Sequence, residues 1–120
     1  MAKESRFMKL IIAGGRDYRL TGADLAVLDE YALTIGVTEV VSGGAAGVDS
    51  DGEAWAKSAG LSVKRFPADW KTHGRAAGPM RNSLMAAYAD ALIAFKGGKG
   101  TANMIRQARD RGLKVVEVFA

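Results

Sequence analysis

The stretch LIAFKGGKGTANMIR, residues 92–106, decides the fold class of this chain. An apolar run leads into Gly97, Gly98 and Gly100, and Thr101 then opens a segment with apolar residues at helical spacing. This order indicates a strand, a glycine turn and a helix. Free backbone N–H groups in the first turn of such a helix favour an anion such as phosphate. A helix simply capped by Thr101 fits this stretch alone equally well.

Four more short segments are predicted to be strands, and the first of them, MKLIIA, has the length and composition of a buried parallel strand. They cover residues 8–13, 37–42, 61–66 and 114–119, so that with Ala91–Phe95 we expect five strands.

Segments with helical spacing of apolar residues lie between these runs. The first helix should begin with a capping box formed by Thr21 and Asp24 and end at Gly36. The others should cover residues 48–59, 79–89 and 101–111. The faces expected to point inward carry Leu25, Leu28, Ala32 and Ile35 in the first helix, Val48, Gly52, Trp55, Ala56 and Ala59 in the second, and Met80, Leu84 and Ala87 in the third. Residues 67–78 should form a loop, long enough to suggest a function.

Alternating strands and helices imply βαβ units, whose right-handed crossovers give a parallel sheet with helices on both faces. We therefore predict an α/β fold. It should be one small Rossmann-like, three-layer domain over residues 1–120, with five parallel strands in the order 3-2-1-4-5 and four helices. In such sheets ligands bind where the strand order reverses, here between the first and fourth strands. Residues 14–16 and 97–101 should line this crevice, with residues 43–49 and 67–82 at its edges.

The composition excludes several classes of protein. The 120 residues include no cysteine and one histidine, which excludes disulfides, zinc–thiolate sites and a histidine metal cluster within one chain. No apolar run approaches the length of a membrane span, and the start, MAKESR, is polar. We expect a cytoplasmic protein with no membrane partner and no metal.

The positive charge is concentrated in residues 64–99. This window holds seven Lys or Arg and two Asp, whereas the rest of the chain holds ten Lys or Arg and eleven Asp or Glu. A positive patch suits a phosphorylated small molecule or a nucleic acid strand, although surface lysines without a function give the same pattern.

Familiar catalytic motifs are missing. Neither a Walker A sequence nor GxGxxG occurs, which excludes a P-loop NTPase and an ordinary dehydrogenase half. Ser42 and Ser83 have neither a second histidine nor a GxSxG elbow to activate them. Asp49, at the start of the second helix, either accepts hydrogen bonds from ribose hydroxyls or complements the helix dipole, and Glu53 should simply be solvated.

Three residues around the long loop are further candidates. Arg81, expected on the first turn of its helix, is the best cation for a phosphate. Trp70 can stack on a base or only pack, and His73 can be an acid or only be solvated.

Five motifs occur in sequence order: Gly14-Gly15-Arg16-Asp17-Tyr18, Gly43-Gly44-Ala45-x-Gly47-x-Asp49, Ala68-Asp69-Trp70, Ala77-Gly78-x-x-Arg81-Asn82 and Gly97-Gly98-x-Gly100-Thr101. Together they resemble the YspA-type, cpYpsA-related branch of the SLOG superfamily, from about residue 8 to 118. The resemblance implies a Rossmann-like domain that binds a nucleotide or nucleotide derivative. The superfamily also contains the Lonely-guy phosphoribohydrolases and DNA-processing protein A, and many members are found in phages and bacterial conflict systems. The candidate ligand-binding residues are Gly14, Gly15, Arg16, Asp17, Gly43, Gly44, Asp49, Trp70, Arg81, Asn82, Gly97, Gly98, Lys99, Gly100 and Thr101.

One departure from the related enzymes concerns catalysis. Lonely-guy enzymes carry a glutamate three residues after the threonine of GGxGT, a position occupied here by Met104. Methionine cannot act as an acid or base, so hydrolysis of an N-glycosidic bond would need Asp49 or Asp17 as a weak substitute.

Three functions therefore stay open. The leading hypothesis is a binding protein, a sensor or sequestering module for a nucleotide-derived ligand, with enzymatic activity undecided and no cofactor certain. The second is a nucleoside-phosphate N-glycosidase. The third is a single-stranded DNA-binding accessory protein, because residues 42–49 resemble a segment of DNA-processing protein A; the lack of basic–aromatic alternation makes this partner less favoured. We also expect a homo-oligomer.

Overall fold

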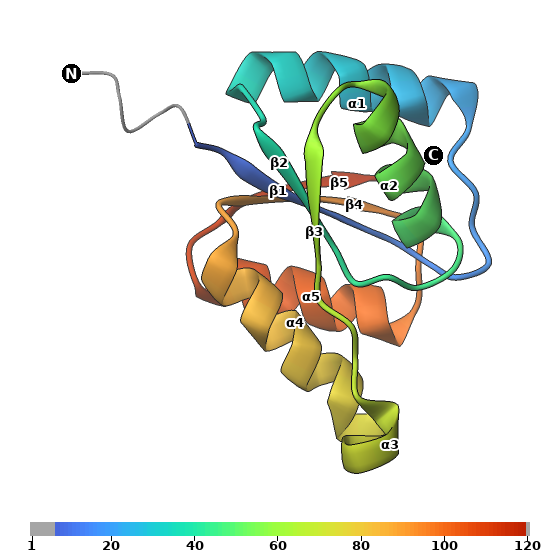
Figure 1. Cartoon of the computed structure of the whole chain (residues 1–120), viewed down its shortest axis with the longest axis vertical. Helices are drawn as coiled ribbons and strands as arrows, with labels where there is room; N and C mark the ends of the chain where they lie inside the picture. The colour runs from blue at the N-terminus through green and yellow to red at the C-terminus, as the bar shows by residue number, and fades with distance from the viewer. Residues whose placement is uncertain (1–6, 120) are drawn as a thin grey trace.

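The computed structural model describes residues 7–119 and contains one five-stranded parallel sheet (Figure 1). Its strands are β1 (Lys9–Ala13), β2 (Glu39–Ser42), β3 (Ser62–Arg65), β4 (Ala91–Phe95) and β5 (Lys114–Val118). The spatial order is β3-β2-β1-β4-β5, and every adjacent pair is parallel. The predicted α/β fold and strand order are confirmed.

Helices cover both faces of the sheet, as Figure 1 shows. α1 (Gly22–Ile35) and α2 (Val48–Ser58) pack on one face, and α4 (Ala77–Tyr88) and α5 (Lys99–Asp110) pack on the other. Successive strand residues point to opposite faces, so Leu10 joins the core beneath α1 and α2 while Ile11 joins the core beneath α4 and α5. These two apolar cores hold the strand ends in register.

The first helix has the predicted capping box and ends at Gly36 as expected. The Thr21 side chain accepts a hydrogen bond from Asp24 N, and the Asp24 side chain accepts one from Thr21 N. Asp24 is buried because it also accepts a bond from the Tyr18 hydroxyl. Leu28 is buried and Ala32 and Ile35 pack against the core, as predicted, whereas Leu25 lies at the surface, one position from the buried Asp24. At the end of α2, Ala59 is likewise exposed rather than inward.

The segment predicted as a loop, residues 67–78, is partly helical. It contains the one-turn helix α3 (Trp70–His73) and the 3₁₀ turn η2 (Gly74–Ala76), and α4 begins at Ala77 rather than at Pro79. Pro79 is the third residue of α4, where a backbone N–H has no partner within the helix, so the missing donor disturbs nothing.

The inward face of α4 also differs from the prediction. Met85 and Ala86 contact the sheet core, whereas Met80 and Leu84 are 45% and 60% exposed and Ala87 is exposed too. The helix is turned this way because Asn82 points toward α5, where it makes hydrogen bonds described below.

No helix within residues 7–119 combines the length and apolar character needed to cross a membrane.

Candidate functional site

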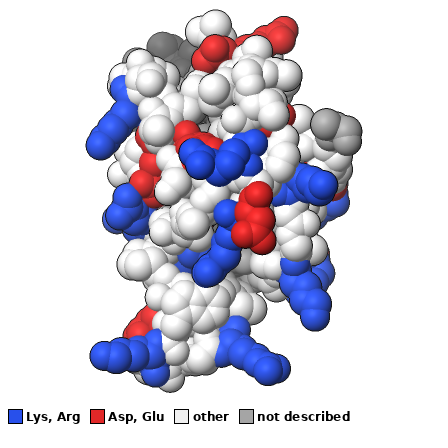
Figure 2. Space-filling view, turned by 90° about the vertical axis from the view of Figure 1, so that its right-hand side faces the viewer, with Lys and Arg blue, Asp and Glu red and all other residues white. Residues whose placement is uncertain are grey.

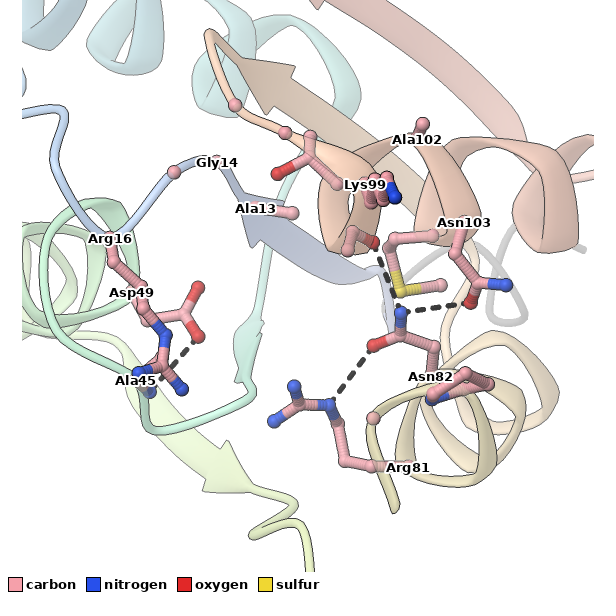
Figure 3. A pocket seen from close by; sticks show the side chains of 18 of the residues that line it. Ala13, Gly14, Arg16, Ala45, Asp49, Arg81, Asn82, Lys99, Ala102 and Asn103 are labelled. Carbon is pink, nitrogen blue, oxygen red and sulfur yellow. Dashed lines mark hydrogen bonds between the residues drawn. The ribbon is translucent and has the colours of Figure 1, made fainter. Parts of the chain in front are cut away.

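A cavity of about 1060 Å³ opens beyond the carboxyl ends of β1 and β4, where the strand order reverses (Figure 3). The loops after these strands form one wall, and the first turns of α4 and α5 form another. Ala45 reaches it from the loop between β2 and α2, and Asp49 from the first turn of α2. This is the crevice expected from the topology.

Most predicted site residues line the cavity. They are Gly14, Gly15, Arg16, Asp17, Asp49, Trp70, Arg81, Asn82, Gly97, Gly98, Lys99, Gly100 and Thr101. Gly43 and Gly44 do not line it. A Cβ atom on Gly43 would lie 2.5 Å from Arg81 Nη1 and 2.9 Å from Asp49 Oδ2, so this glycine makes room for two cavity side chains.

The loops after β1 and β4 are tied to each other through their backbones. Gly15 N–H donates to the Lys96 carbonyl at 2.8 Å. A Cβ atom on Gly97 would clash with Thr101 Oγ1 and lie 2.8 Å from Gly15 N. The close approach of these loops therefore requires glycine at position 97.

The N-terminus of α5 faces the cavity without a side-chain cap. Gly98 is the N-cap residue and has no side chain to accept from the first turn, and Thr101 is the third residue of the helix. The alternative in which Thr101 merely caps this helix is therefore wrong. Gly98, Lys99, Gly100 and Thr101 all line the cavity, so the positive end of the helix dipole lies at its wall.

Asp49 is a buried acid in the cavity wall. It is only 9% exposed, and its Oδ2 accepts a hydrogen bond from Ala45 N–H at 3.0 Å. Burial raises the pKa of this carboxyl above its usual value, and the Ala45 bond and the positive charge of Arg81 oppose the increase. Its neighbour Val48 donates a backbone bond of 3.2 Å to the Gly15 carbonyl, so the first turn of α2, which carries Asp49, contacts the loop after β1.

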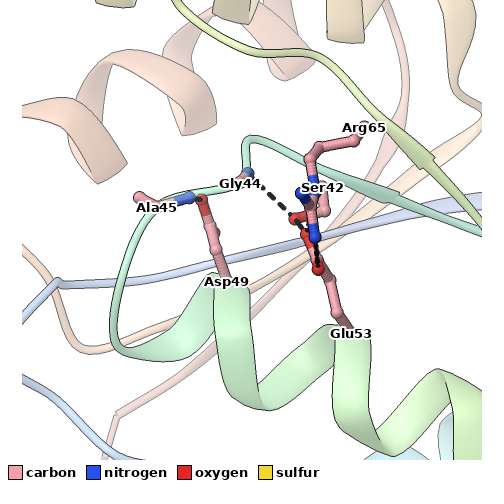
Figure 4. A network of polar contacts seen from close by, with 6 residues as sticks. All are labelled: Ser42, Gly44, Ala45, Asp49, Glu53 and Arg65. Carbon is pink, nitrogen blue, oxygen red and sulfur yellow. Dashed lines mark hydrogen bonds and ion pairs between the residues drawn. The ribbon is translucent and has the colours of Figure 1, made fainter.

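Glu53 was predicted to be solvated, but its carboxylate has protein partners. Arg65 on β3 donates to both of its carboxylate oxygens, and the Ser42 hydroxyl donates at 2.6 Å (Figure 4). Gly44 N–H in turn donates to Ser42 Oγ at 3.0 Å. The Arg65 bonds, assisted by the Ser42 bond, hold the pKa of Glu53 below its usual value. This network fixes the start of the loop that leads to Asp49.

Arg81 lies in the second turn of α4, one turn later than predicted, because the helix starts earlier. Its Nη1 donates to the Gly43 carbonyl at 2.7 Å and more weakly to the Phe66 carbonyl at 3.4 Å, and its Nε donates to Asn82 Oδ1 at 3.0 Å. Burial lowers the pKa of its guanidinium. Arg81 therefore enters the cavity as a half-buried cation held at a fixed position.

Asn82 connects α4 to α5. Its Nδ2 donates to the Gly100 carbonyl at 3.2 Å and to Asn103 Oδ1 at 3.0 Å (Figure 3). Gln107 Nε2 donates to the same Asn103 oxygen at 2.9 Å. These bonds leave Asn82 positioning the first turn of α5 rather than offering a free group to a ligand.

The cavity lining is strongly basic. Six basic side chains, Arg16, Arg75, Arg81, Lys96, Lys99 and Arg106, line it with two acidic ones, Asp17 and Asp49. Figure 2 views the side of the molecule that is at the right in Figure 1 and shows Lys and Arg side chains distributed over it. Arg75, Lys96 and Arg106 were not predicted as site residues. Arg75 lies in the segment predicted as a loop, Lys96 directly precedes the glycine turn, and Arg106 lies two turns into α5. Trp70 lies at the rim, half exposed, and His73 is exposed.

Two comparisons connect the chain with known proteins. The sequence pattern of the YspA, cpYpsA-related SLOG family matches residues 8–73, which include the loops after β1 and β2. The chain is also similar to the Gene 61 protein of Mycobacterium phage D29, with 35% identity over 118 residues that cover 90% of this chain and 94% of that protein. The chain belongs to the YspA, cpYpsA-related SLOG family. No solved structure matches this SLOG chain significantly.

At position 104 the lining of this SLOG cavity is apolar. Met104 lines the cavity floor, is 1% exposed and packs in the core beneath α4 and α5. Within residues 7–119, no group of three or more His, Asp or Glu side chains is arranged to hold a metal ion.

Proposed function

We propose that the cavity binds a nucleotide or nucleotide-derived ligand, with a phosphate at the N-terminus of α5. The observation that carries this proposal is the uncapped first turn of α5, which opens into a basic cavity through Gly98 and Gly100. A helix N-terminus with free N–H groups favours an anion, and glycines let the anion approach the backbone closely.

The surrounding side chains support a phosphorylated ligand. Lys99 is in the first turn of α5, and Arg16 and Arg81 approach from the other walls, so that a negative charge has cations on several sides (Figure 3). The volume of about 1060 Å³ is at the upper end of the range of small-molecule pockets, roughly 300–1000 Å³, and leaves room for sugar and base. Trp70 at the rim offers an aromatic face for the base.

The absence of an acid at position 104 supports binding rather than turnover. An apolar side chain there contributes only packing, so we propose a sensor or sequestering protein. The similarity to a phage protein agrees with a role in phage biology.

The test is a thermal-shift panel of nucleoside phosphates, ADP-ribose, NAD and cyclic dinucleotides, followed by calorimetry on the best compound. At least one compound should stabilise the fold by about 2.7 kcal/mol at 100 times its Kd. Arg16→Ala should weaken binding, because Arg16 lines the cavity, whereas Arg111→Ala, an exposed arginine outside the cavity, should not. Equal losses in the two variants would mean that diffuse charge drives binding. Stabilisation by oligonucleotides alone, with a steep salt dependence, would favour the DNA-binding alternative.

The buried carboxyl of Asp49 favours one second candidate, a nucleoside-phosphate N-glycosidase. A raised pKa suits a proton donor to a leaving base. Incubation with nucleoside monophosphates and chromatographic detection of free base tests this alternative. Release at about 1 s⁻¹ or faster, lost in Asp49→Asn, would replace the binding-only proposal.

A further inference from the structure

On the basis of the proposed nucleotide site, we infer that Asp49 accepts hydrogen bonds from the sugar hydroxyls of the ligand, so that the cavity selects ribonucleotides over 2′-deoxyribonucleotides. Neither the family assignment nor the similarity to the phage protein predicts this preference between sugars.

One carboxylate oxygen of Asp49 faces the cavity. Ala45 N–H occupies Oδ2, and no donor within residues 7–119 reaches Oδ1. Among these residues no fully buried side-chain oxygen lacks a partner, so Oδ1 must have access to solvent. Because Asp49 lines the cavity, that solvent is the cavity interior (Figure 3). Asp49 as a whole is only 9% exposed, so few water molecules reach this oxygen, and a ligand donor there would form a charge-assisted hydrogen bond.

The free Oδ1 of Asp49 is better matched by a neutral hydroxyl than by a phosphate. Asp49 forms no ion pair within 4 Å among the described residues, and the nearby Nη1 of Arg81 is engaged by backbone carbonyls. A phosphate placed against the carboxylate would be repelled, whereas a neutral hydroxyl donates to it. Asp49 therefore favours the sugar part of a nucleotide and leaves the phosphate to α5.

Two backbone hydrogen bonds of Gly15 link the residue before Asp49 to the residue before Gly97, and so connect Asp49 to the proposed phosphate site. The Gly15 carbonyl accepts from Val48 N–H, next to Asp49, while Gly15 N–H donates to Lys96, next to Gly97. The carboxylate and the N-terminus of α5 thus lie on either side of one glycine loop. Asp49 and the first turn of α5 line the same cavity, so a nucleotide with its phosphate at α5 can extend its sugar toward Asp49.

The experiment compares the four ribonucleoside 5′-monophosphates with their 2′-deoxy counterparts by calorimetry. For every ribonucleotide that binds, the wild-type Kd should be lower than that of the 2′-deoxy form by a factor of about ten or more, as expected for a charge-assisted hydrogen bond. In Asp49→Asn, which keeps an oxygen for Ala45 N–H, this ratio should fall below about three-fold, mainly through weaker ribonucleotide binding. Glu30→Gln, which removes a charge from the exposed face of α1, should keep the wild-type ratio.

Each other outcome has a definite meaning. Equal binding of ribo and deoxy forms by the wild type overturns this inference and leaves the nucleotide site intact, and it does not depend on a variant folding. An equal loss for both sugar types in Asp49→Asn, confined to adenine, cytosine and guanine, would assign Asp49 to the exocyclic amine of the base and also overturn it. If no nucleotide, ADP-ribose, NAD or cyclic dinucleotide binds, the proposed function fails and the inference fails with it.

Discussion

The Asn82 side-chain amide donates to the Gly100 carbonyl at 3.2 Å, so α4 holds the first turn of the helix whose N-terminus faces the cavity. Asn82 is buried, and its oxygen also accepts from Arg81 Nε. We expect Asn82→Ala to lower the free energy of unfolding by about 1–3 kcal/mol, because it leaves buried partners unsatisfied. Urea denaturation measures this loss. Ser83→Ala, the next residue on α4, provides the control and should change stability by less than about 0.5 kcal/mol.

Gly97, in the loop after β4, and Gly100, in the first turn of α5, should respond to alanine in opposite directions. Gly97→Ala should destabilise the fold, since its Cβ would clash with Thr101 Oγ1 and crowd Gly15 N. Gly100→Ala should stabilise it by about 0.5–1 kcal/mol, because Gly100 lies within α5 and nothing lies within 4 Å of its Cβ position. Thermal denaturation of both variants tests the pair. Stabilisation by Gly97→Ala would show that the contact between the two loops does not limit position 97, and destabilisation by Gly100→Ala would contradict the prediction for position 100.

Stability should depend on pH through Asp49. Burial raises the pKa of its carboxyl in the folded chain, so between 3.8 and the raised pKa the folded state binds more protons than the unfolded state. This contribution to stability is present at low pH and is lost as pH rises through that window. Asp49→Asn should therefore be more stable than the wild type at pH 7, and the difference should shrink below about pH 4. Urea titrations at several pH values measure it; a variant less stable at pH 7 would contradict the sign.

The expected homo-oligomer is best tested at the outer face of α4. Met80, Leu84 and Ala87 are exposed on this face and carry no charge, so two positively charged copies can approach there without repulsion. We predict that the wild type sediments as a dimer and that Leu84→Lys shifts it to monomer in sedimentation velocity runs. Leu33→Lys on α1, where the leucine is 84% exposed, should leave the dimer intact. A monomeric wild type at micromolar concentration would refute the expectation.

The sequence predicted the sheet well because its signals are local. The central strands β1 and β4 are short apolar runs ended by glycine turns. The box of Thr21 and Asp24 involves residues only three positions apart. Strand order followed from the handedness of crossovers, which depends on backbone geometry rather than on particular side chains.

The orientation of α4 could not be predicted because the helix has two apolar faces. Met80 and Leu84 fit the spacing of an inward stripe as well as Met85 and Ala86 do, and the choice depends on Asn82 meeting residues of α5 about twenty positions away. Periodicity contains no such information.

The candidate site was predicted in outline, because glycine loops at a switch point are visible in sequence. The positions of its side chains were not. Glu53 was expected to be solvated, because nothing in the sequence links it to its partner Arg65 on the next strand. Gly43 was predicted as a ligand contact, but it lies outside the cavity lining and leaves space for Arg81 and Asp49.

The backbone bonds that join the loops have a consequence for the speed of ligand capture. Gly15 joins the loop after β1 both to Lys96 and to Val48, so these cavity walls are already fixed before a ligand arrives. Little loop ordering then has to accompany association, and the basic lining attracts an anion over a distance that shrinks as salt is added. We expect fast association that slows with ionic strength, and affinities among related nucleotides that differ mainly in how long each complex survives.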